Sequence, residues 1–459
     1  MSTPIIDTLA SFATSTSYES LPDATVRSTK RVLLDSIGCA LGATTTDPGK
    51  VTIGIARQLG GPGECSILGT GDRVAITNAV FANGQLVNLL DFDTVMPGGH
   101  TPPYIVPTVL GMAEREGASG RELVVATAVA LELSARMARA VPRGMGFVEE
   151  DGERVFRYAE REGYARLNFG AAAGAGRLRG LTDAQMVNAL AHAGHLSQLN
   201  TWSRGNFSMP RNLSKYGFAG WQNTGAILAI MLAEGGIMGD VGLLDDGEHG
   251  YGEMSGYGGW FPEHLLPGLG EEWGFDEVRF KAYACCTMLH RAIECFEEIV
   301  GANRLHPDEI ERVTVYASPT VEAVLFQDRS LNNIVDLQFG TPYMMAMVAH
   351  GERSGADWQD WNKLTDPRMT AFADRVSVVP HPDYADNEAS KVEVLARGET
   401  FTAERYGMTA PLDDAQLVDK FRHNAARPLT QQQIDRAVDA LEHLEELDDI
   451  RHLMTDLTQ

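Results

Sequence analysis

Two stretches of the chain are apolar on almost every side of a helix, and they constrain the fold more than any other feature of the sequence. Residues 121–140 carry leucine, valine, methionine or alanine at most positions, and residues 217–235 contain an unbroken run of alanine, isoleucine, leucine and methionine from Ala226 to Ala233. A helix that is hydrophobic all round has to be surrounded by protein. Each stretch therefore predicts a helix in the middle of a helical bundle. No apolar run approaches the roughly 18 residues that a membrane span needs, so we expect no membrane partner.

Further helices are predicted through the first 270 residues. Apolar side chains keep helical spacing over residues 5–43, 51–59, 73–90, 104–116, 169–178 and 182–199. A glycine-rich segment, 60–71, predicts a turn or short hairpin. Residues 141–163 break the helical pattern with a mixed charged run. We interpret them as an exposed segment that leaves the helical domain, with a short helix as one option. Gly235–Gly270 has 12 glycines in 36 residues and predicts a long ordered loop, which in compact domains often covers an active site.

The pattern changes near residue 275. Residues 311–317 alternate as a strand should, and 376–379, 391–396 and 399–405 predict further strands, with helices between them. Amphipathic helices return over 413–457 and are expected to pack on the first domain. The prediction is a mainly α chain with an α+β second domain. Residues 1–270 and 406–459, from both chain ends, would form a large all-helical domain, and 271–405 an inserted α+β lid domain.

The charge and the cysteines restrict the partners and the compartment. A formal net charge of −24 argues against nucleic acid and anionic membranes, since both attract basic surfaces. An anionic substrate would need a locally basic pocket. Five widely spaced cysteines, an odd number, indicate reduced thiols rather than a disulfide framework. Because no signal peptide is evident near the first residue, we expect a cytoplasmic protein.

The segment between Leu89 and Pro103 carries side chains suited to acid–base chemistry. Asp91 and Asp93 follow the end of a predicted helix, and a Pro-Gly-Gly turn then leads to His100. A histidine titrates near neutrality and can exchange protons with a ligand. The simpler interpretation is that the aspartates end helices and His100 lies on a surface loop. Taken alone, this segment favours the simpler interpretation.

A basic loop in this acidic protein is a candidate carboxylate-binding site. Residues 202–216 contain Arg204, Arg211 and Lys215, and Lys215 lies where the next helix begins. The N–H groups at a helix N-terminus attract anions, and guanidinium and ammonium groups bind carboxylates. The alternative is an ordinary exposed loop.

Two other patterns resemble a dinucleotide-binding motif and a metal site but do not match either one. Gly174-Ala175-Gly176 is followed by Gly180, one position too late for a dinucleotide-binding fingerprint, and no strand precedes it. His192 and His195 have a spacing that can hold a metal, but no third ligand lies at helical spacing, and core histidines are commoner. We therefore predict no metal site.

Four segments together resemble the MmgE/PrpD family of 2-methylcitrate dehydratases, cis-aconitate decarboxylases and iminodisuccinate epimerases. They are Leu33–Gly42, Asn88–Asp93 with His100, Lys215 with the helix that ends in residues 232–239, and Lys281–Cys285 with His290. Their order and spacing span almost the whole chain. The resemblance implies a helical domain made from both chain ends, an inserted α+β lid, a homodimer, and no metal or iron–sulfur cofactor.

The resemblance also implies an interdomain pocket lined by Asp91, His100, Lys215, Lys281 and Tyr343. Family members move a proton at a carbon next to a carboxylate, which needs a base, an acid and cations that hold the substrate. His100 would be the base, with Asp91 orienting it. Lys215 would bind a carboxylate or act as an acid, and Tyr343 would act as an acid or donate a hydrogen bond. The residues expected to bind substrate are Asp93, Arg204, Arg211, Lys281 and Cys286.

The expected activity is a lyase, either a dehydratase or a decarboxylase, acting on a small polycarboxylate, ahead of an epimerase or isomerase. Family decarboxylases carry a second pocket histidine where residues 162–167 have none, and another where Cys286 stands. These differences favour another carboxylated substrate over cis-aconitate. A catalytically idle carboxylate-binding relative and a helical scaffold protein are the remaining alternatives. The four candidate catalytic residues count against the first, and the basic loop would have no purpose in the second.

Overall fold

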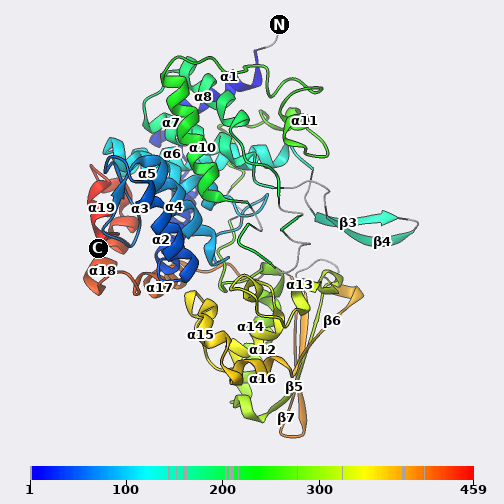
Figure 1. Cartoon of the computed structure of the whole chain (residues 1–459). Helices are drawn as coiled ribbons and strands as arrows, with labels where there is room; N and C mark the ends of the chain where they lie inside the picture. Colours follow the sequence, from blue (N-terminus) through cyan, green and yellow to red (C-terminus); the bar gives the residue numbers. More distant parts are fainter. Residues whose placement is uncertain are drawn as a thin grey trace.

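The computed structural model describes residues 3–142, 145–150, 152–158, 163–201, 204–205, 211–214, 217–275, 278–322, 324–384, 389–407 and 409–459, and every structural statement concerns these. Figure 1 shows the helices of both chain ends gathered in one body, with the sheet of the second domain at the opposite end of the molecule. The predicted fold class, mainly α with an α+β second domain, is confirmed. The boundaries after residues 270 and 405 remain predictions.

The first part of the helical body is built around α6. Its helices are α1 (Ile5–Ser15), α2 (Asp23–Ala43), α3 (Asp47–Leu59), α4 (Ile76–Leu89), α5 (Pro102–Glu116), α6 (Gly120–Arg139), α7 (Leu167–Leu178), α8 (Asp183–His195) and α10 (Ala219–Glu234). Every residue of α6 from Leu123 to Met137 is buried, as the all-round apolar pattern predicted. A Cβ atom on Gly174 of α7 would lie 2.5 Å from the Ala126 carbonyl oxygen of α6. The glycine–alanine pattern of α7 therefore serves close helix packing.

Helix α10 differs from its prediction, because one of its faces is exposed. Trp221 and Met231 are about half exposed, at 54% and 50%, and Leu228 and Leu232 are partly exposed. These positions recur at helical spacing and so share one face. An apolar face that a partner covers has the same sequence pattern as a face buried within the chain, so the sequence could not separate the two cases.

Two hairpins interrupt the helical body. The predicted turn region forms β1 (Cys65–Ser66) and β2 (Arg73–Val74), so α4 begins at Ile76 rather than at Arg73. The segment at 141–163 contains an antiparallel hairpin of β3 (Met145–Glu150) and β4 (Glu153–Tyr158), and the option of a short helix is wrong. Aromatic and β-branched residues suit these strands, and Gly152, at φ 81°, supplies the left-handed turn. The glycine-rich segment 235–270 is mostly loop, with the short α11 (Tyr251–Ser255) inside it.

The second domain combines helices with a four-stranded sheet. Its elements are α12 (His290–Asn303), β5 (Ile310–Ala317), α13 (Val324–Gln327), α14 (Thr341–Ala349), α15 (Trp361–Leu364), α16 (Pro367–Ala373), β6 (Val376–Pro380), β7 (Ser390–Ala396) and β8 (Glu399–Arg405). The strand order is β6-β5-β7-β8, with β5 and β6 parallel and the other pairs antiparallel. Helix α12 packs on β7 and β8. All four strands lie where the sequence predicted them.

Short 3₁₀ helices occur along the whole chain, in both domains. They lie at Tyr18–Ser20, Pro262–His264, Thr287–Leu289, Pro307–Glu309, Pro319–Glu322, Asp336–Gln338, Ala356–Gln359, Pro382–Tyr384 and Leu444–Glu446.

The C-terminal helices return to the helical body, as predicted. They are α17 (Asp414–Ala425), α18 (Gln431–Glu442) and α19 (Arg451–Asp456), and α17 packs against α2 (Figure 1). Cβ atoms on Gly38 and Gly42 of α2 would lie 3.1 Å from a Phe421 ring atom and 2.9 Å from Asn424 Oδ1 of α17. These glycines let the two helices approach closely. Among the described residues, no helix has the length and apolarity to cross a membrane.

Candidate active site

The segment after α4 makes two sharp turns that bring its polar side chains inward. Asp91 has φ 52°, a left-handed conformation that is uncommon for a residue other than glycine, and it is completely buried. Farther on, the Met96 and Gly99 backbones exchange hydrogen bonds of 3.0 and 2.8 Å, with Gly98 and Gly99 at positive φ. Such outliers cluster at functional sites. The predicted Pro-Gly-Gly turn before His100 is confirmed.

His100 is held by two buried carboxylates. Its side chain is 9% exposed, Nδ1 lies 2.7 Å from Asp93 Oδ2, and Nε2 lies 3.6 Å from Asp91 Oδ1. Asn88 donates to the other Asp93 oxygen at 3.3 Å. The surface-loop interpretation of His100 is therefore wrong. The short contact that orients the imidazole belongs to Asp93 rather than to Asp91, a distinction that residue spacing alone could not make.

The second domain contributes Lys281 to this cluster. Its Nζ donates to Asp91 Oδ2 at 2.9 Å and to the Asp91 carbonyl oxygen at 2.8 Å. Burial lowers the pKa of Lys281, but the nearby charges of Asp91 and Asp93 outweigh it, so the pKa lies above its ordinary value. An antiparallel bridge between Val95 and Arg279, with hydrogen bonds of 2.9 Å in both directions, brings the lysine segment alongside the loop.

Tyr164 and Arg166, which the sequence did not single out, support the loop from the side of α7. The His100 backbone N–H donates to the Tyr164 hydroxyl at 3.3 Å, and the rings of the two residues meet edge-on at 6.4 Å. Arg166 donates to the Gly98 carbonyl at 2.6 Å. A Cβ atom on Gly99 would lie 2.5 Å from the Tyr164 hydroxyl, so this close approach requires glycine. Both residues lie in segment 162–167, which contains no histidine.

Two buried glutamines join the second domain to the end of α4. Gln338 donates to the Leu89 carbonyl at 2.7 Å, and Gln359 donates to the Leu90 carbonyl at 2.6 Å. The Cys286 backbone N–H in turn donates to the Gln338 carbonyl at 2.8 Å. This chain of contacts places Cys286 at the junction of the two domains. No pattern in the sequence indicated the two glutamines.

Cys286 is expected to react slowly with iodoacetamide near pH 7.5, several-fold more slowly than cysteine in an unfolded chain. Burial and the charge of Asp91 raise the pKa of the Cys286 thiol, although Lys281 partly offsets them, and only the thiolate attacks the reagent. Mass spectrometry of the labelled peptide over time measures the rate. The same protein in urea is the control. Equal rates in both conditions would contradict this description of the thiol.

The other predicted site residues have no described role in the His100 cluster. Arg211 is buried, and its guanidinium lies 3.9 Å from the centre of the Phe339 ring. Arg204 is exposed. Lys215 lies outside the described residues, as does most of the basic loop. The Tyr343 hydroxyl donates to the Arg329 carbonyl at 2.9 Å, and no described contact links it to His100. The structure thus brings Asp91, Asp93, His100 and Lys281 together, and the catalytic and binding roles of all the predicted residues stay predictions.

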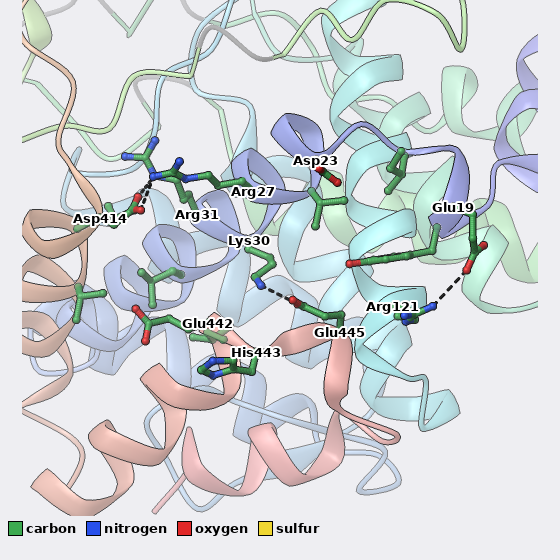
Figure 2. A pocket seen from close by; sticks show the side chains of 17 residues that line it. Glu19, Asp23, Arg27, Lys30, Arg31, Arg121, Asp414, Glu442, His443 and Glu445 are labelled. Atoms are coloured by element: carbon green, nitrogen blue, oxygen red, sulfur yellow. Dashed lines mark hydrogen bonds and ion pairs between the residues drawn. The ribbon is translucent and has the colours of Figure 1, made fainter.

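A separate cavity of about 760 Å³ lies between α2, α17 and the segment around Glu445. Figure 2 shows its cations facing carboxylates, with Lys30 on Glu445 and Arg121 on Glu19. The described residues that line it include none of the predicted site residues. We therefore distinguish it from the candidate active site.

The fold and the site together define a class of protein. A helical body closed by both chain ends, an α+β domain inserted into it, and a buried histidine–carboxylate–lysine cluster at their junction describe a two-domain protein suited to moving protons. Sequence comparison gives the family. The MmgE/PrpD N-terminal domain matches residues 7–260 and the MmgE/PrpD C-terminal domain matches residues 283–445, so the chain belongs to the MmgE/PrpD family.

Several curated relatives match nearly the whole chain at low identity. A cis-aconitate decarboxylase of Aspergillus terreus is 22% identical, with 96% of this chain and 94% of that protein covered. The cis-aconitate decarboxylases of Homo sapiens and Mus musculus are 25% and 26% identical. They cover 95% and 94% of this chain, and the match spans 90% and 88% of their own lengths.

Proposed function

We propose that the protein is a lyase, a dehydratase or a decarboxylase, that moves a proton at a carbon next to a carboxylate of a small polycarboxylate. The observation that carries the proposal is the placement of His100 Nδ1 at 2.7 Å from Asp93, beside the buried Lys281–Asp91 pair. Membership of the MmgE/PrpD family and the relatives named as cis-aconitate decarboxylases support this class of reaction.

The base in this proposal is Nε2 of His100. A carboxylate accepts the proton of Nδ1, so the contact with Asp93 favours the tautomer whose basic nitrogen is Nε2, and it stabilises the imidazolium that forms. Removal of a proton next to a carboxylate leaves negative charge on the substrate. Lys281 would supply positive charge beside Asp91, and Arg211 would supply more from the neighbourhood of Cys286. Lys215 would bind a second carboxylate or act as an acid, and Tyr343 would act as an acid or donate a hydrogen bond.

We further propose a substrate other than cis-aconitate and a reaction that needs no added cofactor. By the resemblance, Cys286 stands where family decarboxylases would have a histidine, and Tyr164 and Arg166 occupy the segment of a second one, which has no histidine here. A thiol held protonated and two residues that already support the loop offer a different set of donors to the substrate. His100 and Lys281 supply a base and a positive charge from the chain itself.

Proton NMR in D₂O with a panel of di- and tricarboxylates tests the proposal. New alkene signals with exchange of the proton next to the carboxylate identify a dehydratase. Loss of carbon dioxide with gain of deuterium identifies a decarboxylase. Exchange that yields only inverted or mixed stereochemistry identifies an epimerase and contradicts the lyase proposal. Substrate binding without exchange or product would favour a catalytically idle relative.

We also propose that the protein is a cytoplasmic homodimer that pairs through the exposed face of α10. This helix has no charged residue before Glu234, whereas the chain carries a net charge of −24. Two copies of an acidic protein repel each other except where they meet through uncharged surface. An exposed apolar patch on a helix is typical of such contacts. The five cysteines are free in the structure, which agrees with a reducing compartment.

Replacing Trp221 by glutamate is expected to convert the dimer into a monomer at micromolar concentration. The substitution places a desolvated charge in the centre of the apolar face, which a second copy can no longer cover favourably. Light scattering coupled to gel filtration measures the mass. Trp361→Glu is the matched control, since Trp361 is an exposed tryptophan of the second domain. A wild-type monomer, or a Trp221→Glu variant that remains dimeric, would contradict the proposal.

A further inference from the structure

A lysine of the C-terminal tail contacts the backbone of both segments that carry the candidate active site. Nζ of Lys420, on α17, donates to the Phe92 carbonyl at 2.7 Å and to the Lys281 carbonyl at 3.0 Å. It also lies 3.8 Å from the centre of the Phe92 ring, and the side chain is 7% exposed. One buried cation therefore contacts the loop after α4 and the lysine segment of the second domain at the same time.

Asp35 of α2 fixes this lysine. Asp35 Oδ1 forms an ion pair with Lys420 Nζ at 2.7 Å, and Oδ2 accepts from the Thr94 hydroxyl at 2.6 Å. Asp35 is 2% exposed. Because α2 and α17 pack closely through Gly38 and Gly42, both members of the ion pair are carried on one rigid helix pair. The helix pair thus holds the loop at Phe92 and at Thr94.

The contacted atoms lie next to the side chains that the proposed reaction uses. Phe92 stands between Asp91 and Asp93, which flank His100. The Lys281 carbonyl belongs to the residue whose side chain pairs with Asp91. Lys420 therefore links the segment that carries the histidine–aspartate half of the cluster to the segment that carries the lysine half, through contacts to backbone, to Asp35 and to the Phe92 ring.

We propose that Lys420 is a positioning residue for the reaction, held by Asp35, and that this role makes the C-terminal tail part of the active site. The inference rests on the proposed function of the His100 cluster. Proton transfer depends steeply on geometry, since a displacement of about 1 Å can cost about 10²-fold in rate. A lysine that only stabilised the fold would change the melting temperature without changing the rate of the folded enzyme.

The test compares Lys420→Met with Lys420→Arg and with Arg136→Met. Arg136 forms a completely buried ion pair with Glu132 in α6, so Arg136→Met also removes a buried cation and leaves a buried carboxylate. The described contacts of Arg136 are to Glu132 and to the Leu265, Pro267 and Glu272 carbonyls, and none of these residues belongs to the His100 cluster. All assays are made well below the melting temperature of each variant. Lys420→Met is expected to lower kcat by about 10²-fold with KM changed by less than about threefold. Lys420→Arg should recover part of the loss, and Arg136→Met should keep kcat close to wild type.

Hydrogen exchange gives a readout that needs no substrate. The amides of Val95 and Arg279 form the bridge beside the lysine segment, and they should exchange faster in Lys420→Met but not in Arg136→Met. If Lys420→Met does not fold, Thr94→Val replaces it, because it removes the contact with Asp35 and keeps Lys420. It should show the same loss of kcat in weaker form.

The outcomes separate the two proposals. A wild-type protein that is inactive on every polycarboxylate overturns the proposed function, whatever the exchange data show. An active wild type with a folded Lys420→Met variant of equal kcat overturns the positioning role, as does a Thr94→Val variant with unchanged kcat when Lys420→Met does not fold. An equal loss of kcat in Arg136→Met would also overturn it, because the effect would then follow from destabilisation in general.

Discussion

Replacing His100 by glutamine is expected to lower the rate of proton abstraction by about 10²- to 10⁴-fold, the usual contribution of a positioned general base. Glutamine can still donate a hydrogen bond to Asp93, which lies 2.7 Å from Nδ1 of the histidine. It cannot accept a proton at neutral pH. The loss should therefore appear in kcat, while substrate binding changes little. The rate of deuterium incorporation from D₂O into bound substrate measures this step directly.

Asp93→Asn separates the orientation of His100 from its basicity. Asparagine keeps the size of the side chain, but its amide can donate a hydrogen to Nδ1 and so favours the other tautomer, in which Nε2 carries the proton. We expect a loss of activity of the same order as for His100→Gln, and little further loss when the two substitutions are combined. Deuterium incorporation at the wild-type rate in His100→Gln would show that another group is the base.

The sequence predicted the layout of the fold because its strongest signals are local. Period-3.6 apolar patterns located the C-terminal helices, a run that is apolar on almost every side located α6, and alternation located β5. The hairpin of β3 and β4 was missed because its charged residues obscured the alternation of its apolar ones. Helix α10 was predicted to be buried because propensity and pattern do not reveal whether a face is covered by the same chain or by another.

The candidate site was predicted in part, for a related reason. Asp91, Asp93 and His100 lie within ten residues of each other, so their proximity follows from the sequence, and Lys281 entered through the resemblance. The contacts that hold them are long-range. Lys420 is 328 residues from Phe92 along the chain, and Gln338 is 249 residues from Leu89. A single sequence carries no signal that pairs such positions, and these contacts became visible only in the folded chain.

The buried pair of Lys281 and Asp91 also controls stability. Lys281→Met is expected to destabilise the fold by about 3–5 kcal/mol at pH 7, because it leaves a charged carboxylate buried without its ion-pair partner. Both side chains of the pair are almost completely buried, at 2% and 0% exposure, and their atoms lie 2.9 Å apart. The shift of the urea midpoint relative to wild type measures the loss. Asp91→Asn combined with Lys281→Met should recover part of it, since no uncompensated charge then remains.

The pH dependence of this effect identifies the ion pair as its cause. The pKa of Lys281 is raised above its unfolded value of about 10.4. The folded state therefore binds the lysine proton more tightly than the unfolded state does. The stability that the pair contributes is fully present below about pH 10 and is lost as the pH rises through the folded-state pKa. Wild type and Lys281→Met should thus differ most near neutrality and converge at strongly alkaline pH. A difference that stays constant across this range would assign the loss to packing of the lysine side chain rather than to its charge.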